Sequence, residues 1–291
     1  RQATLSRGHA MQLGLIGVDS SHAEDFLRHF NTERRHNDIA VTALWDDNRE
    51  RVAALRQLDS SLVAAHSIAA LVDQVDAVIV GDRHGDLHHA HSILALAARR
   101  PVFIDKPLAN SLADARAIVA AAEATGTPLL SGSALRWQSE TRRLKAKLAG
   151  LDGPIELLAY GTWYPQNDYG GAIFYAIHTV ELVQELLGIE WRKLGLASDD
   201  PPRVRYKTHQ HAVALEFRPL VEGQSSDFGV MVKAGKIKFQ QSIALGDDYM
   251  LPVADQIAAM LRNSHSPMSR AELLAPIALM EEIDALLRVT A

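Results

Sequence analysis

Residues 11–22, Met-Gln-Leu-Gly-Leu-Ile-Gly-Val-Asp-Ser-Ser-His, place a short apolar run before a glycine and a polar turn. Apolar residues at helical spacing follow, so the stretch predicts a buried strand, a turn and a helix. Strand-length apolar runs and helical stretches keep alternating up to residue 133, which is typical of a doubly wound parallel sheet. Expected strands are 11–17, 39–45, 77–80, 101–104 and 128–131, and expected helices are 22–30, 49–57, 68–72, 88–98 and 112–124.

The pattern changes after residue 133, where short alternating strands with glycine-containing turns indicate an antiparallel sheet. We therefore expect a Rossmann domain over 11–133 and a C-terminal α+β domain over 134–291, whose final helix can pack back on the first domain. Residues 1–10 are expected to be a loose tail or a vector-derived remnant. Expected strands are 155–161, 204–206, 212–217, 228–233 and 236–241, and expected helices are 140–149, 172–187, 254–262 and 270–288.

The composition excludes several classes of protein. Of the 291 residues 47% are hydrophobic and 22% are charged, which is the mix of a globular fold and not of a disordered chain. A net charge of -5 gives no electrostatic footprint for nucleic acid, and no apolar window is long enough for a membrane helix. The absence of cysteine excludes disulfides and thiolate chemistry, and it is compatible with the cytoplasm, which is the expected location.

The turn after the first strand stands where a dinucleotide-binding fold carries G-x-G-x-x-G, so that the backbone can approach a pyrophosphate. Only Gly17 is present, and Asp19 takes the second glycine position. Ser21 and Glu24 also match a capping box, which would occupy N–H groups of the helix. The residues alone leave two interpretations open: a loop that binds phosphates through Ser20, Ser21 and backbone amides, or a helix start that binds nothing.

Asp46 ends the second strand, where an acidic side chain would accept hydrogen bonds from an adenosine ribose. Its carboxylate favours NAD over NADP because it repels a 2′-phosphate, but Arg49 and Arg51 nearby leave NADP open. An ordinary turn acid is an equally good interpretation of this position without other support.

Two further residues are candidates for acid–base chemistry. Lys106 lies in Ile104-Asp105-Lys106-Pro107 at the end of a strand, where side chains point into the ligand crevice of a parallel sheet. His178 follows a glycine pair on a predicted helix and could act as a general base, with Glu181 one turn away holding its ring. Taken singly, a structural turn and a packed histidine explain the same residues.

A histidine-rich tract offers a rival interpretation as a metal site. Helical rotation separates neighbouring histidines by about 100°, however, and no second cluster has ligand spacing. We therefore expect no metal. The tract consists of His84, Asp86, His88, His89 and His91.

Together these motifs resemble the glucose–fructose oxidoreductase/inositol dehydrogenase/MocA family, in order and spacing, over nearly the whole chain from Met11. Members are NAD(P)-dependent dehydrogenases of sugars, cyclitols and related hydroxy compounds, with a Rossmann domain and a C-terminal α/β domain that makes oligomer contacts. The motifs are Asp105–Pro107, the exit 131–137 from the fifth strand, the turn 153–155, the glycine pair 170–171 with the helix to His178, and His88 after the third strand.

The resemblance implies roles for named residues. His178 would take the hydroxyl proton while hydride leaves the same carbon for NAD or NADP, and Lys106 would position the oxygen. The cofactor set is Gly17, Asp19, Ser20, Ser21, His22, Asp46, Gly81, His88, Asp105 and Lys106. The substrate set is Arg136, with a preference for an anionic group, and Trp163, Tyr164, Asn167, His178 and Glu181. A small-molecule substrate and a homodimer or homotetramer follow from the same resemblance.

The sequence departs from the family in two places. The family has an aspartate four residues before the catalytic histidine, where this chain has Phe174, and the glycine loop contains Asp19. The alternatives are therefore a redox-neutral lyase, epimerase or glycosidase on the same fold, which uses a retained cofactor transiently, or a non-catalytic binding protein with a decayed cofactor site. A metal-dependent hydrolase is a further alternative, from the histidine tract.

Overall fold

The structure is a computed structural model that describes residues 10–220 and 226–289. Its first half is a six-stranded parallel sheet with the order β3-β2-β1-β4-β5-β6. The strand order reverses between β1 and β4, and this is the arrangement of a doubly wound fold. The strands are β1 (Met11–Ile16), β2 (Ile39–Trp45), β3 (Val63–Ala64), β4 (Ala77–Val80), β5 (Val102–Ile104) and β6 (Leu129–Ser131).

Helices cover both faces of this sheet, so its strands are apolar on both sides. Residues of α3, α4 and α5 pack on one face, and residues of α1 and α2 pack on the other. Helix α5 ends at Gly126, whose φ of 65° is a conformation that glycine adopts readily. The helices are α1 (His22–Leu27), the π-helix η1 (Arg28–Thr32), α2 (Arg49–Leu58), α3 (Ile68–Val72), α4 (Leu87–Ala97), α5 (Leu112–Thr125) and the 3₁₀ helix η2 (Ala134–Trp137).

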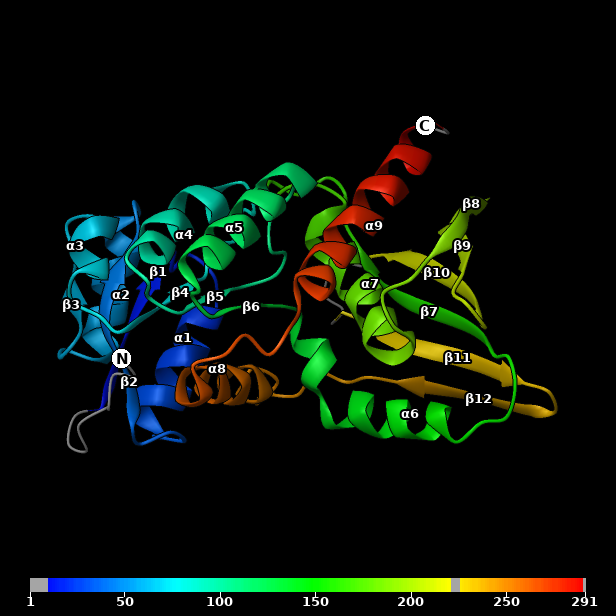
Figure 1. Cartoon of the computed structure of the whole chain (residues 1–291), viewed down its shortest axis with the longest axis horizontal. Helices are drawn as coiled ribbons and strands as arrows, with labels where there is room; N and C mark the ends of the chain where they lie inside the picture. The colour runs from blue at the N-terminus through cyan, green and yellow to red at the C-terminus, as the bar shows by residue number, and fades with distance from the viewer. Residues whose placement is uncertain (1–9, 221–225, 290–291) are drawn as a thin grey trace.

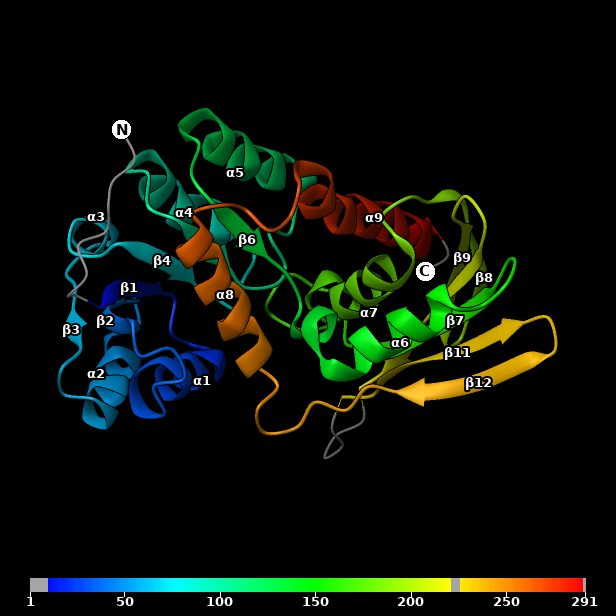
Figure 2. The same cartoon turned by 60° about the horizontal axis from the view of Figure 1, so that its bottom comes forward.

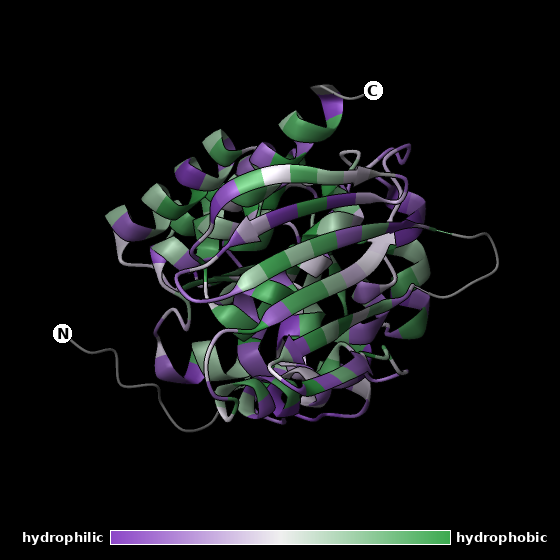
Figure 3. Ribbon diagram, turned by 90° about the vertical axis from the view of Figure 1, so that its right-hand side faces the viewer, coloured by the Kyte–Doolittle hydropathy of each residue, from purple (hydrophilic) through white to green (hydrophobic). Residues whose placement is uncertain are grey.

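The second half is a mixed sheet with the order β12-β11-β7-β10-β9-β8, in which only β7 and β10 run parallel. The fold class predicted from the sequence is therefore confirmed. Helix α7 packs on β7, and Figure 3 shows the opposite face of the sheet with no helix of the described residues over it. The elements are α6 (Ser139–Ala149), β7 (Glu156–Trp163), α7 (Ile173–Leu187), β8 (Arg192–Asp199), β9 (Pro202–Lys207), β10 (Ala212–Pro219), β11 (Phe228–Ala234) and β12 (Ile237–Ser242).

Helix α8 returns to the first half of the molecule, and α9 contacts both halves. Helix α8 (Leu251–Asn263) packs its apolar residues into the same core as α1 and α2, and α9 (Arg270–Val289) lies against both α5 and α7. Figures 1 and 2 show α8 beside the parallel sheet and α9 bridging α5 and α7. An ion pair between Arg262 and Asp38 adds a polar contact between the end of α8 and the start of β2.

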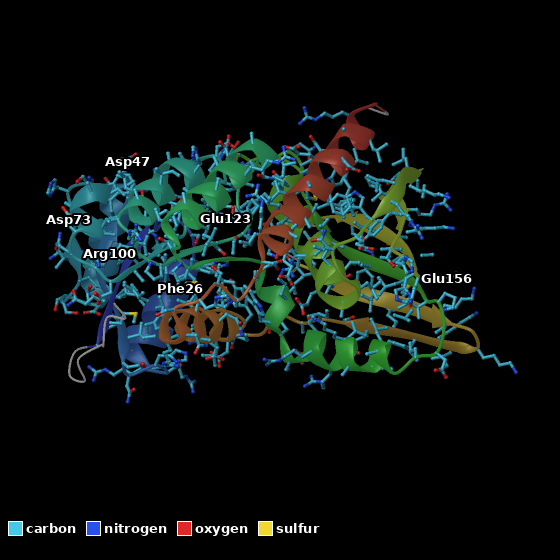
Figure 4. All side chains as sticks on the ribbon, in the orientation of Figure 1. Phe26, Asp47, Asp73, Arg100, Glu123 and Glu156 are labelled. Atoms are coloured by element: carbon cyan, nitrogen blue, oxygen red, sulfur yellow. The ribbon has the colours of Figure 1, made fainter. Side chains whose placement is uncertain are left out.

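The side chains sort by burial as the two cores require. Phe26 of α1 is fully buried under the parallel sheet, whereas Asp47, Asp73 and Glu156 are exposed on the periphery, where Figure 4 labels them. No described helix is both long and apolar enough to cross a membrane.

Several elements differ from the prediction. Strands β3 and β8 are absent from it, because β3 has only two residues, both exposed, and β8 carries Arg192, Lys193 and Asp199. The helix predicted over 22–30 is present, but it changes to a π-helix at Arg28 and continues to Thr32, with His29 and Phe30 buried. The predicted tail over 1–10 lies outside the described residues except for Ala10.

Candidate active site

A cavity of about 310 Å³ lies at the carboxyl end of the parallel sheet. Residues that follow β1, β4 and β5 form one side, and residues of α7 and the second sheet form the other. Ligands of open α/β sheets bind in the crevice beyond the carboxyl ends of the strands, so this cavity is the candidate site. Its lining residues are Ser20, Ser21, His22, Asp82, Arg83, Asp105, Lys106, Phe174, Tyr175, His178, Ser226, Phe228, Leu245 and Tyr249.

Lys106 follows β5 and is almost completely buried. Its Nζ lies 3.4 Å from the carbonyl oxygen of Phe174 and 3.9 Å from the centre of the Phe174 ring. Burial lowers the pKa of Lys106 and outweighs the negative charge of Asp105, which would raise it. The positive charge of Arg83 lowers this pKa further. An amine held in this way can donate a hydrogen bond to a hydroxyl oxygen and stabilise negative charge on it.

Asp105 forms a close pair with His22 at the base of the cavity. Its Oδ2 lies 2.5 Å from His22 Nδ1, and its Oδ1 accepts the backbone N–H of Lys106 at 2.9 Å. Burial on its own would raise the pKa of Asp105, but the charge and hydrogen bond of His22 outweigh it and lower the pKa to about 2. The carboxylate is therefore ionised at any ordinary pH. Its contacts hold the α1 start against the Lys106 turn.

His178 extends from α7 into the same cavity. Its Nδ1 lies 2.6 Å from the Oγ of Ser133, and its ring lies 5.4 Å from the ring of Phe228, centre to centre. Burial lowers the pKa of His178 well below its usual value, and the positive charge of Lys106 lowers it further. The imidazole is neutral at neutral pH, which is the state in which it can take a proton from a substrate.

Glu181 and Arg136 lie behind His178 and do not line the cavity. Glu181 Oε2 accepts the backbone N–H of Ser133 at 2.7 Å and the Nε–H of Arg136 at 2.6 Å, and both side chains are buried. Sequence analysis had Glu181 hold the imidazole ring and Arg136 bind an anion. The structure places Ser133 at the ring instead, and it uses Arg136 to neutralise Glu181.

The loop after β1 is shaped by close contacts between strands. Gly17 has a φ of 76°, and a Cβ there would lie 2.4 Å from the Asp82 side chain. A Cβ on Gly81 would lie 2.9 Å from the carbonyl oxygen of Gly17. Both positions therefore need glycine, because a side chain at either one would push apart the loops that follow β1 and β4.

The same loop has donors that suit a phosphate. Across residues 10–220 and 226–289, no hydrogen-bond acceptor meets the backbone N–H groups of Asp19, Ser20 or Ser21. Asp46 is buried and accepts the N–H of Val18 at 2.6 Å and that of Asn48 at 2.7 Å. A carboxylate has about four acceptor positions, so two remain for ribose hydroxyls. The loop and Asp46 therefore fit a dinucleotide.

Asp19 is the unusual member of this loop. Its Oδ1 accepts the backbone N–H of Arg83 at 3.2 Å. Burial raises the pKa of Asp19 and outweighs that hydrogen bond, and the charges of Asp46 and Asp82 also raise it. The surroundings of Asp19 therefore disfavour its charged form relative to an exposed aspartate.

The predicted capping box is wrong. Ser21 makes no side-chain cap bond, and the N–H of His22 is bound by Ser20 Oγ at 3.2 Å. Glu24 pairs instead with Arg51, whose guanidinium also donates to the carbonyl oxygens of Val18 and Ser20. Because its carboxylate binds Arg51, Glu24 does not accept the backbone N–H groups of the loop, and these remain available to a ligand.

The histidine tract after β4 does not converge on one point. His88 is buried with its ring nitrogens against the carbonyl oxygens of Pro107 and Asp82, at 2.7 and 2.9 Å, so it ties two loops together outside the cavity. His91 pairs with the Asp82 side chain at 2.9 Å. In the described part of the chain, the one group close enough to share an ion is His29, Glu33 and Asp248, which lies outside this cavity.

The aromatic segment before α7 contributes less to this cavity than sequence analysis expected. Trp163 lines a separate cavity with Asn110 and Met280, and Tyr164 is exposed. Asn167 donates to the carbonyl oxygen of Gly171 at 2.7 Å and shapes the loop.

Four functional residues were missed by sequence reasoning. Arg83 could have been found, because it follows β4 at the ligand edge of the sheet, as Lys106 follows β5. Ser133 carries the same signal, because it follows β6 at that edge, whereas Phe228 and Tyr249 have none, since they reach the site through the packing of distant segments.

Comparison with known proteins agrees with this geometry. Residues 11–133 match the profile of an oxidoreductase family with an NAD-binding Rossmann fold, named GFO_IDH_MocA. The chain is 31% identical to an inositol 2-dehydrogenase of Acidothermus cellulolyticus over 145 residues, which are 50% of this chain and 42% of that protein. It is 28% identical to a 2,7-anhydro-N-acetylneuraminate hydratase of Escherichia coli over 193 residues, 60% of this chain and 49% of that one. The chain thus spans less than half the length of each relative.

The fold extends beyond the matched part of the sequence. The structure of GenD2 from gentamicin A biosynthesis in complex with NAD is similar over 98% of this chain and 96% of that one, with a TM-score of 0.81 and 14% identity. This likeness covers both sheets. The profile match covers residues 11–133, and over this part the chain is similar to the glucose–fructose oxidoreductase/inositol dehydrogenase/MocA family of oxidoreductases.

Proposed function

We propose that the protein is an NAD(P)-dependent dehydrogenase of a sugar, cyclitol or related hydroxy compound. The observation that carries the proposal is the meeting of Lys106 and His178 in one cavity, although they come from the two different halves of the chain. That cavity also includes Ser20 and Ser21 of the loop that fits a dinucleotide. An amine, a neutral imidazole and a phosphate-binding loop are the groups that oxidation of a hydroxyl needs.

The residues of this chain have separate roles in the proposed reaction. Lys106 donates a hydrogen bond to the reacting hydroxyl, and His178 takes its proton. The nicotinamide ring, when bound, accepts the hydride from the same carbon. Phe174 packs against the Lys106 ammonium group and keeps water from it, so the amine binds the substrate oxygen more strongly.

We favour NAD as the cofactor. Asp46 supplies the carboxylate that accepts ribose hydroxyls, and neither neighbouring arginine is free for a 2′-phosphate. Arg49 donates to the carbonyl oxygen of Ala65 at 3.0 Å, and Arg51 is held by Glu24 and two loop carbonyls.

The remaining expectations from the sequence enter here as proposals. We place the domain boundary near residue 133, and we expect a dimer or tetramer through the open face of the second sheet. Met231 and Ile237 on β11 and β12 are 40% and 50% exposed, which supports such a contact. The absence of cysteine supports a cytoplasmic location.

A redox-neutral reaction is the second candidate. It is favoured by the match to a hydratase, which extends over more of this chain than the match to the inositol dehydrogenase. Phe174 supports it as well, because it stands where the dehydrogenases of the family have an aspartate, and the site therefore has one acidic group fewer.

Two measurements test the proposal. Titration with NAD and NADP, followed by protein fluorescence, should show binding with preference for NAD. Incubation with sugars and hydroxy acids should then change the nicotinamide absorbance, and Lys106→Met and His178→Asn should each abolish that change. Substrate turnover with no net change in absorbance would favour the redox-neutral reaction instead. Absence of nucleotide binding would overturn both.

A further inference from the structure

Arg83 lines the cavity, and among the residues that the structure describes its guanidinium forms no ion pair. Its backbone N–H is bound by Asp19, but its side chain lies over the ring of Tyr169, with Cζ 4.1 Å from the ring centre. Cζ is also 5.8 Å from the centre of the Phe174 ring. In the ranges 10–220 and 226–289 no carboxylate lies within ion-pair distance of this guanidinium. Its donors are thus held on an aromatic surface and left available.

Lys106 places a second positive charge beside the same ring. Its Nζ lies 3.9 Å from the centre of the Phe174 ring, while the nearby Asp105 carboxylate is bound to His22 and to a backbone N–H. Burial is the largest cause of the lowered pKa of Lys106; the charges of Asp105 and Glu181 oppose this shift, and the charge of Arg83 adds to it. Two like charges in one partly buried cavity repel each other, and an anion between them would relieve this repulsion.

The aromatic side of the cavity supplies no negative charge. Position 174 is a phenylalanine, and Tyr169 packs on it with a ring separation of 5.0 Å. The remaining acids of the lining are already bound: Asp105 by His22, and Asp82 by His91. Within residues 10–220 and 226–289, the carboxylates of the lining are thus engaged by histidines, and the Arg83 guanidinium is left open to the carboxylate of a ligand.

From these contacts we infer that the substrate is a hydroxy acid, whose carboxylate is bound by Arg83. This rests on the proposed function of the site. The planar guanidinium matches a carboxylate through two parallel hydrogen bonds, and the rings of Tyr169 and Phe174 fix its orientation. Because Arg83 and Lys106 flank one ring, the carboxylate lies within a few bonds of the hydroxyl that Lys106 and His178 bind.

The reaction balances with the groups named. The C–H bond of the hydroxyl-bearing carbon breaks, and its electron pair leaves with hydrogen as hydride to NAD⁺. The O–H proton passes to His178, and the C–O bond becomes a carbonyl. A hydroxy acid and NAD⁺ thus give a keto acid, NADH and a proton.

The test compares matched acids and neutral compounds on the full chain. D-Gluconate is compared with D-glucitol, and D-galacturonate with D-galactose, by calorimetric binding with NAD present and by initial rates. We expect each acid to bind at least about tenfold more tightly than its neutral partner. Arg83→Gln should weaken acid binding about 10- to 100-fold, and Arg83→Lys, which keeps the charge but loses the planar fork, should recover only part of it.

Controls separate binding from folding. Arg143→Gln, on the exposed face of α6, removes an arginine outside the cavity and should change neither affinity, and thermal melts establish that each variant is folded. Equal affinity for acid and neutral partners, or acid binding unchanged in folded Arg83→Gln, would overturn the inference. Tighter binding of glucose 6-phosphate than of both acids would also overturn it. So would an Arg83→Gln variant that loses affinity for NAD but keeps its affinity for the acids.

The inference and the proposed function can fail separately. Acid binding that depends on Arg83 without nicotinamide reduction would retain the inference on the ligand and remove the dehydrogenase. Reduction of nicotinamide by neutral sugars, with no preference for acids, would retain the dehydrogenase and remove the inference.

Discussion

The Nδ1 atom of His178 lies 2.6 Å from the Oγ of Ser133, at the position where sequence analysis had expected Glu181 to act. The Oγ of Ser133 also accepts the backbone N–H of Leu135 at 3.2 Å, so the hydroxyl is fixed by its own loop. For Nε2 of His178 to take a proton, Nδ1 must carry the hydrogen and donate it. Ser133 is therefore a positioning residue, which sets both the orientation and the tautomer of the imidazole.

Ser133→Ala should lower kcat about tenfold or more, with little change in KM, because the imidazole loses the group that orients it. Ser133→Thr should recover activity, since it keeps the hydroxyl. Steady-state kinetics over a range of pH values check this. Ser131→Ala is the matched control from the same strand exit, and an equal loss in that variant would show that the effect is general packing.

Activity should fall on acidification only well below the usual titration range of histidine. Burial lowers the pKa of His178, so its neutral form persists as the pH decreases. The kcat/KM profile from about pH 5 to pH 9 measures this, at constant ionic strength. An acidic limb at or above the ordinary histidine pKa of about 6.5 would contradict it.

The same shift predicts how stability depends on pH. The unfolded chain binds a proton at His178 below about pH 6.5, whereas the folded chain does not, so the free energy of unfolding decreases with falling pH. The slope from this group is at most about 1.4 kcal/mol per pH unit. Urea unfolding of the wild type and His178→Asn should show a shallower acid dependence in the variant. Identical slopes would contradict the prediction.

NAD binding should weaken as the pH rises, because Asp19 ionises beside the loop that holds the phosphates. Its pKa is raised by burial, so ionisation extends above the usual range of aspartate. Asp19→Asn keeps an acceptor for the Arg83 N–H and should bind NAD more tightly, with less dependence on pH. Fluorescence titration at several pH values measures both. Asp47→Asn removes an exposed carboxylate nearby and should leave the affinity unchanged.

His22→Ala should destabilise the protein by about 1.5 to 3 kcal/mol, because a buried carboxylate loses its hydrogen-bond partner. The stability that the lowered pKa of Asp105 supplies is present above about pH 4 and is lost as the pH falls through about 2. The loss should therefore be largest at neutral pH and shrink in acid. His89→Ala, whose ring is half-exposed, should cost less than half as much in the same urea titrations.

Sequence patterns identified the parallel sheet because its strands are buried on both faces and form continuous apolar runs. They also found Lys106, since the end of a strand fixes where the next residue points. They failed for Glu181 and Arg136, because spacing along a helix shows which residues share a face but not which segment lies opposite that face. Glu181 faces the exit of β6, and it binds Ser133 and Arg136 there.

Helix α8 has a consequence for how the molecule moves and unfolds. It belongs to the last fifth of the chain, but Val253, Ala254 and Ile257 complete the core under the first sheet. The chain therefore crosses between the two halves three times, before α6, before α8 and before α9. Two halves joined by three backbone connections can rotate only slightly relative to each other. Lys106 and His178 therefore keep their positions across the cavity. A chain cut at residue 133 would lose one wall of its core, so we expect the two halves to unfold in a single transition.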